Sequence, residues 1–140
     1  MHAVKNIGSL VLAIAALPPL ANAAGTRNGA AIDRLQSGSL AMSCVLVRNT
    51  GATTGAPSTQ TLDVKLQDSA DGSTGWADIT GAALTQKTTA TAGLDQLDVD
   101  LSGAKRYIRT VEVTAFSGGT TPATPNAVEV ILGGGSRLPA

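Results

Sequence analysis

The sequence predicts an all-β protein, an antiparallel β-sandwich of jelly-roll or immunoglobulin-like type with an extended N-terminal arm. Three observations support this fold class. Short segments in which apolar and polar residues alternate recur along the chain, as expected of strands buried on one face. Loops rich in Gly, Pro, Asn and Asp separate these segments. After residue 38, no segment shows the 3.6-residue apolar spacing of an amphipathic helix.

We divide the 140 residues into an N-terminal arm or leader (1–38), one β-sandwich domain (39–132) and a C-terminal tail (133–140). Six strands are expected in the domain, over residues 39–48, 61–67, 76–79, 94–101, 105–116 and 127–132. The second has the clearest alternation, with Leu62, Val64 and Leu66 on one face. Residues 80–93 are expected to form an irregular connection.

The strand over residues 105–116 should be central because it is rich in residues that suit a pleated surface. Its pattern does not indicate which face points inward. Tyr107, Arg109 and Val111 share one face, while Ile108 and Glu112 share the other. Both sets mix apolar and polar residues, so a bulge or burial of both faces remains open.

The first 23 residues resemble a secretory signal, with Lys5, the apolar stretch 7–17 and the small residues of Ala21-Asn22-Ala23. The apolar stretch is shorter than the roughly 20 residues that a spanning helix needs. We expect the leader to be retained as an arm on another subunit, so that deleting residues 1–23 leaves a folded sandwich. The alternatives are a partly disordered tail, a short helix on its own domain, or cleavage after Ala23 and secretion.

The composition argues for a structural or binding module and against an enzyme. Ten basic residues balance ten acidic ones, and Trp76, Tyr107 and Phe116 are the only aromatic residues. Neither a phosphate-binding patch nor a base-stacking platform is therefore expected, which excludes direct nucleic-acid binding. With His2 and Cys44 as the only residues of their kinds, we expect no catalytic triad, cofactor, metal site or internal disulfide.

Two acidic motifs have structural interpretations. The segment 68–73 contains a glycine preceded by oxygen ligands, as calcium loops do, but Asp71 is the only acidic residue at the three ligand positions, which indicates a turn. Asp98 and Asp100 would project from one face of a strand, at a spacing that glycosidases use. Nothing near them in the sequence would raise the pKa of one carboxyl selectively, so a solvated strand face is the simpler interpretation.

Partner binding is assigned to three groups of residues. The apolar side chains of the leader lack partners in the predicted sandwich. The single basic cluster could bind a carboxylate of a partner protein or could be a solvated strand edge. The C-terminal tail adds one basic and one apolar residue. The candidates are Ile7, Leu10, Leu12, Ile14, Leu17, Lys105, Arg106, Arg109, Arg137 and Leu138.

Three segments, 65–73 (KLQDSADGS), 76–79 (WADI) and 103–109 (GAKRYIR), followed by 130–133 (VILG) and an Arg-Leu-Pro-Ala tail, resemble the head decoration (cement) proteins of tailed bacteriophages. The resemblance covers roughly residues 39–140. The usual order in that family is aspartate, glycine, serine, tryptophan. Here Thr74-Gly75 stands between the serine and Trp76, which affects the geometry of the turn and not the order of the strands.

The resemblance implies a structural protein on the exterior of the virion capsid, with no membrane association. Its partners would be the major capsid protein, whose subunits it would bridge to stabilise the shell, and copies of itself in a dimer or trimer. A neck, tail or fibre component of the virion is an alternative. Another is a secreted carbohydrate-binding module similar to discoidin-like jelly rolls, although three aromatic residues offer little for sugar stacking.

Overall fold

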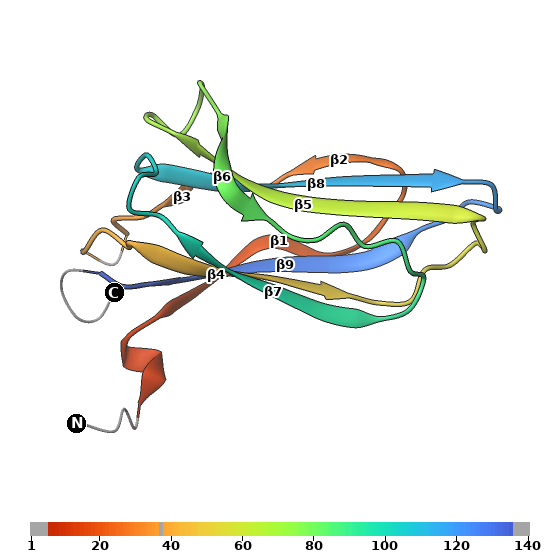
Figure 1. Cartoon of the computed structure of the whole chain (residues 1–140), viewed down its shortest axis with the longest axis horizontal. Coiled ribbons are helices and arrows are strands. Elements are labelled where there is room, and N and C mark those ends of the chain that lie inside the picture. The colour runs from red at the N-terminus through yellow and green to blue at the C-terminus, as the bar shows by residue number, and fades with distance from the viewer. Residues whose placement is uncertain (1–5, 37, 136–140) are drawn as a thin grey trace.

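The computed structural model describes residues 6–36 and 38–135. Two antiparallel sheets pack face to face, as Figure 1 shows. Sheet A has the order β1-β9-β4-β7, and sheet B has the order β2-β8-β5-β6, with β3 also paired to β8. The strands are β1 (Leu12–Asn22), β2 (Gly25–Asn28), β3 (Ile32–Asp33), β4 (Ser43–Thr50), β5 (Thr59–Ser69), β6 (Ala77–Ala83), β7 (Gly93–Asp100), β8 (Tyr107–Ser117) and β9 (Thr124–Gly133), preceded by a 3-10 turn, η1 (Ile7–Ser9).

This strand order is that of a jelly roll, in which β2 and β3 share the place of one strand. The chain crosses between the sheets at every connection except those from β2 to β3 and from β5 to β6. In sheet A, β4 pairs along its whole length with both β7 and β9. The predicted antiparallel sandwich is thus confirmed, and of its two variants the structure adopts the jelly roll.

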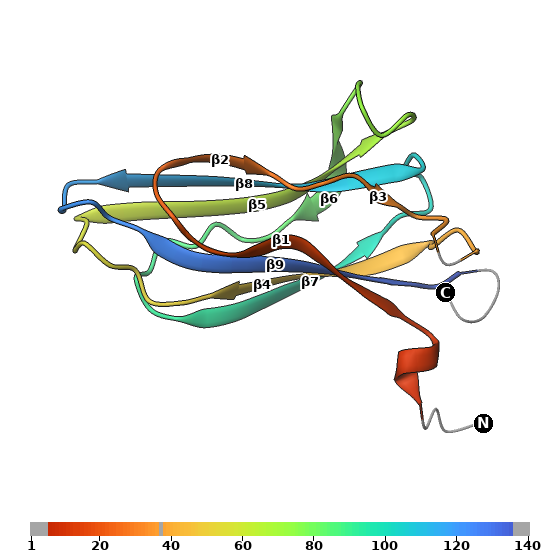
Figure 2. The ribbon, with the colours of Figure 1, turned by 180° about the vertical axis from the view of Figure 1, so that it is seen from behind.

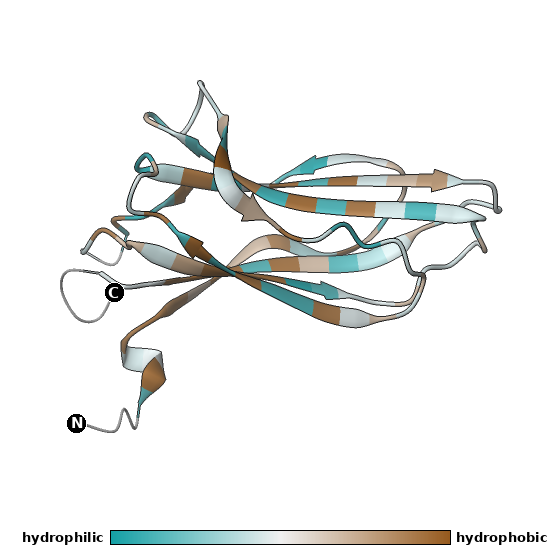
Figure 3. Ribbon diagram, viewed as in Figure 1, coloured by the Kyte–Doolittle hydropathy of each residue, from teal (hydrophilic) through white to brown (hydrophobic). Residues whose placement is uncertain are grey.

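The six predicted strands correspond to β4–β9. In β5, Leu62, Val64 and Leu66 are at most 1% exposed, and apolar and polar residues alternate along the strand in Figure 3. Strand β6 extends to Ala83, into the stretch predicted to be irregular. Strand β8 turns Ile108 and Glu112 inward, so its mostly polar face is the buried one.

The prediction that residues 1–38 form an arm outside the sandwich is wrong for most of this segment. Strand β1 pairs with β9, while β2 and β3 pair with β8, so residues 12–33 contribute to both sheets. Of the described residues, 6–11 precede the first strand, and Figures 1 and 2 show them leading away from the sandwich. No helix among the described residues is long and apolar enough to cross a membrane.

The composition of β1 explains why this strand is hard to recognise in the sequence. Alanine occupies both buried and exposed positions, so the alternation has little hydrophobic contrast. Ala16 and Leu17 are nevertheless buried, at 5% and 2% exposure. The register with β9 shifts on both sides of Leu17, and Pro18-Pro19 lies in the second irregularity. Proline is tolerated there because β1 is an edge strand, where ladder donors are not all needed.

The sandwich interior combines an apolar cluster with buried arginines. Leu46, Leu66, Leu101 and Ile108 are fully buried in the cluster. Next to Leu101, the side chain of Arg34 is 1% exposed. Its guanidinium donates hydrogen bonds of 2.6–3.0 Å to the carbonyl oxygens of Ala41, Leu101, Ala104 and Lys105. Arg34 thereby joins the chain before β4 to the connection between β7 and β8.

A second buried arginine links the two sheets. Arg48 lies on β4 of sheet A and donates to the Leu62 carbonyl on β5 of sheet B. It also donates to the Thr85 carbonyl and forms an ion pair of 2.8 Å with Asp95 on β7. Leu62 and Asp95 are held by their strands and Thr85 follows β6, and each of the three side-chain nitrogens of the desolvated guanidinium has a hydrogen-bond partner.

The structure changes the expectation for N-terminal deletion. Removing residues 1–23 deletes β1 and exposes the edge of β9, with the buried Val128 and Val130 beneath it. We expect this variant to be unfolded or aggregated, whereas removal of residues 1–10 leaves the melting temperature within a few degrees of the full chain. Circular dichroism melts of the two deletion variants test this; a folded chain lacking residues 1–23 would contradict it.

Replacing Arg34 by Met should lower the free energy of unfolding by about 3 kcal/mol, because four buried carbonyls lose a charged donor. The matched control is Arg106→Met, which removes an exposed arginine from an ion pair and should cost less than about 1 kcal/mol. Urea denaturation of both variants measures the difference. Equal losses would mean that the Arg34 contacts do not stabilise the fold.

Candidate partner-binding surfaces

The leader residues proposed for partner binding divide into two groups. Leu12 and Ile14 are half-buried and pack against the apolar cluster, and Leu17 is buried. These three side chains help to hold β1 in the sandwich. Ile7, which is 70% exposed, and the half-buried Leu10 lie before β1 and remain available. Arg137 and Leu138 lie outside the described residues.

The predicted basic cluster is not a patch of free cations. Both nitrogens of the Arg106 fork donate to the carboxylate of Asp33 at 2.9 Å, and this pairing lowers the pKa of Asp33. Arg109 stacks 4.6 Å from the centre of the Trp76 ring and donates to Gln67 Oε1. The remaining member, Lys105, is exposed. The cluster therefore serves mainly intramolecular contacts.

The three central segments of the family resemblance come together at one end of sheet B, in what we call the motif cluster (65–73, 76–79 and 103–109). Lys65 and Gln67 on β5 both bind the carboxylate of Asp78 on β6. The backbone N–H of Lys105 donates to Asp68. A Cβ on Gly72 would lie 3.1 Å from the Tyr107 ring, and the φ of Gly72 is +77°, so glycine is required there on both grounds.

In the turn within this cluster, the oxygens of the Asp71 carboxylate accept hydrogen bonds from donors of the same turn. Asp71 accepts hydrogen bonds from the backbone N–H groups of Ser73 and Thr74 and from the hydroxyls of Thr74 and Ser69. These bonds lower the pKa of Asp71. Within residues 6–36 and 38–135, no group of three or more His, Cys, Asp or Glu side chains is arranged to hold a metal ion.

Asp98 and Asp100 both lie exposed on β7, on the face predicted for them. The carboxylate of Asp100 accepts the backbone N–H of Ser102, which lowers its pKa, whereas a general acid needs a raised one. Cys44 is buried, and burial raises the pKa of its thiol to about 12, which leaves it unreactive as a nucleophile.

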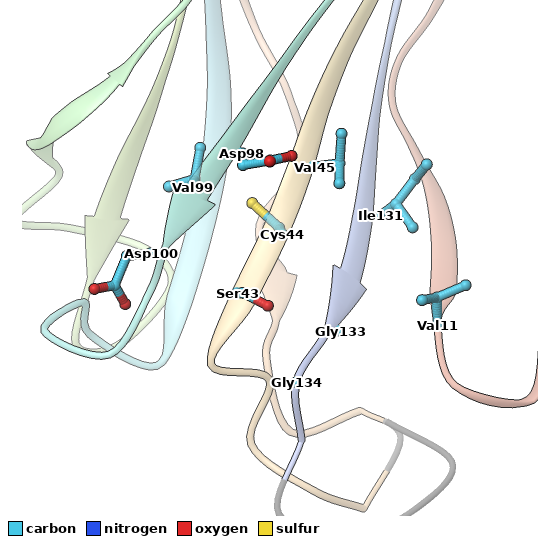
Figure 4. A pocket seen from close by; sticks show the side chains of 10 residues that line it. All are labelled: Val11, Ser43, Cys44, Val45, Asp98, Val99, Asp100, Ile131, Gly133 and Gly134. Carbon is cyan, nitrogen blue, oxygen red and sulfur yellow. The ribbon is translucent and has the colours of Figure 1, made fainter. Parts of the chain in front are cut away.

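The outer face of sheet A contains a shallow hollow that the sequence analysis did not identify. Val45 on β4, Ile131 on β9 and Val11 before β1 contribute its apolar side chains, and Asp98 and Asp100 border it from β7 (Figure 4). In the strand register, Val45 is paired with both Ile131 and Asp98. The signal in the sequence is the apolar run 44–47, whose every second residue points away from the core.

A buried polar group lies between the sheets at Glu112, which is 1% exposed. Its carboxylate accepts hydrogen bonds from the side-chain amides of Asn22 on β1 and Asn126 on β9, and Arg27 on β2 pairs with it at 3.4 Å. Burial raises the pKa of Glu112, and the Arg27 charge partly offsets the effect. The group joins β1, β2, β8 and β9. It could not be located from the sequence because the alternation in residues 105–116 does not indicate which face of that strand points inward.

No family model matches the chain, and no curated protein sequence matches it. Among solved structures, it is similar to PBSX exported protein XepA, with a TM-score of 0.61 and 18% identity over 98% of this chain. The match covers 41% of XepA, so the chain spans about two-fifths of that protein's length. At this identity, the similarity shows the fold alone.

Two virus structures give weaker matches. For infectious bursal disease virus Gt strain, the TM-score is 0.47, at 14% identity over 87% of this chain and 31% of the other. For Desmodium yellow mottle tymovirus, the TM-score is 0.43, at 9% identity over 92% of this chain and 81% of the other.

The raised pKa of Glu112 predicts a specific pH dependence of stability. The folded state holds the proton more tightly than the unfolded chain, so the contribution of Glu112 to the free energy of unfolding falls as the pH rises above the ordinary glutamate value of about 4.3. This decline continues to the raised pKa and then stops. Urea denaturation between pH 4 and 8 should show it in the wild type and not in Glu112→Gln. A constant difference between the two proteins across this range would contradict the assignment.

Proposed function

We propose that the chain is a structural protein of a tailed-phage virion, and specifically a head decoration protein. It binds the outer surface of the icosahedral head, bridges subunits of the major capsid protein and so stabilises the shell. It acts by surface contact and catalyses no reaction. Copies of the chain associate with one another as well as with the shell.

The observation that carries this proposal is the motif cluster. The resemblance to decoration proteins rests on the segments 65–73, 76–79 and 103–109. The first two are nearly adjacent in the sequence and the third lies on a later strand, and all three form one contact network at the end of sheet B. Their combination on a jelly roll supports a common architecture with that family.

Other features agree with a shell protein. A jelly roll is a common architecture of viral capsid domains. The interior is held in part by the buried Arg34 and Arg48, whose side-chain nitrogens all have hydrogen-bond partners, and this suits a module that must remain folded at a surface. The structural similarity to XepA adds agreement in fold alone.

Two alternative functions are a secreted carbohydrate-binding module and a neck, tail or fibre component of the virion. A secreted carbohydrate-binding module would require cleavage after Ala23, which would remove β1 from sheet A together with the buried Leu17 and Asn22. That cost speaks against secretion through this segment. A neck, tail or fibre component would have the same fold and surfaces, and differs in copy number per particle.

Mass spectrometry of gradient-purified particles tests the proposal. We expect the full-length chain in hundreds of copies, near the abundance of the major shell protein. A few copies or a dozen would instead indicate a neck, tail or fibre component. Absence from particles, with a mature N-terminus at Ala24 elsewhere, would overturn the virion assignment.

A further inference from the structure

The formal neutrality of the chain conceals an uneven distribution of charge between the two sheets. Among the residues of β1, β9, β4 and β7, the only Lys or Arg is Arg48. It is 1% exposed, points into the sandwich and is paired with Asp95. The outer face of sheet A therefore carries no cation from its own strands.

Three carboxylates lie on that outer face. Glu129 on β9 is exposed and pairs in register with Ala15 and Val47, while Asp98 and Asp100 are exposed on β7. The four ion pairs between described residues are Arg27–Glu112, Arg48–Asp95, Lys65–Asp78 and Arg106–Asp33. None of them includes a carboxylate of this face. Its negative charge is consequently not neutralised within the described chain.

Apolar side chains fill the space between these acids. Residues paired in register form one row that crosses all four strands of sheet A: Ala13 on β1, Ile131 on β9, Val45 on β4 and Asp98 on β7. Val47 extends the apolar surface along β4, and Val11 extends it along the hollow seen in Figure 4. With strands about 4.8 Å apart, the row spans roughly 14 Å, which is enough to seat a single loop or strand of another protein.

We propose that this acidic-rimmed apolar face, centred on Val45 and Ile131, is the surface that docks on the shell. Its partner is a protein segment that presents a Lys or Arg beside branched apolar side chains. The cation binds Asp98 or Glu129, and the apolar side chains cover Val45 and Ile131. The inference rests on the proposed function and assigns a surface and a partner chemistry to it.

Other occupants fit less well. Two copies docked through the same face would bring Asp98, Asp100 and Glu129 of both together without a cation between them, which costs free energy. A phosphate backbone would be repelled by the same charges. A sugar would find no aromatic ring to stack on, since Trp76, Tyr107 and Phe116 lie outside the strands of sheet A.

The experiment adds full-length protein to shells that lack it and measures bound copies against free concentration. Asp98→Lys should raise the Kd at least tenfold, and wild-type binding should weaken with added salt. Asp63→Lys is the matched control: it makes the same change on β5 in sheet B, where Gln86 is the side-chain hydrogen-bond partner of Asp63. This control should stay within twofold of wild type.

A second variant, Val45→Thr, keeps the shape and strand preference of valine and should raise the Kd several-fold. Circular dichroism melts establish that each variant is folded before binding is measured. Light scattering of the free protein shows whether a second copy occupies the face instead. Loss of self-association in Asp98→Lys, with shell binding unchanged, would overturn the inference.

The outcomes separate this inference from the proposed function. If wild-type protein does not bind shells, the proposed function fails and the inference falls with it. If wild type binds and Asp98→Lys and Val45→Thr bind equally well, the function stands and the assigned surface is wrong. Equal weakening by Asp98→Lys and Asp63→Lys would also overturn it, because net charge alone would then explain the effect.

Discussion

The guanidinium of Arg34 is the contact on which the end of the sandwich depends. Four carbonyl oxygens from two stretches of chain converge on it, and burial lowers its pKa without removing its charge. Neither stretch is part of a ladder at those positions. The hydrogen bonds of the charged, planar guanidinium therefore hold these connections in place, as ladder hydrogen bonds hold the strands of the sheets. It holds the start of β4 and the start of β8 in the positions from which both sheets extend.

The regular strands could be predicted from the sequence, and the N-terminal third could not. In the middle of β5, Leu62, Val64 and Leu66 place a large aliphatic side chain at every second position, so period and burial coincide. In β1, alanine and proline provide little contrast, and the signal-like composition suggested a separate leader. In β8, threonine and glutamate form the inward face because Glu112 is bonded to Asn22 and Asn126, residues that no local pattern connects to it. Local periodicity carries no information on such distant polar partners.

The same reasoning explains the outcome for the candidate surfaces. Counting Lys and Arg along the chain singled out Arg106 and Arg109 as a candidate partner-binding cluster. Only the fold shows that Asp33, Gln67 and Trp76 contact them within the chain. The outer face of sheet A was overlooked for the opposite reason. Its acids and aliphatic residues come from strands that are distant in sequence and become neighbours only through the register of β9, β4 and β7.

The irregular pairing of β1 also affects how the molecule behaves at high concentration. Pro18 and Pro19 lack backbone donors, and the register shifts around Leu17 bend the edge of sheet A. Another strand cannot continue the ladder along such an edge, so uncontrolled fibre growth by strand addition is blocked on that side. Association by strand addition is thus limited at this edge, while the outer face of sheet A stays open for contacts through its side chains.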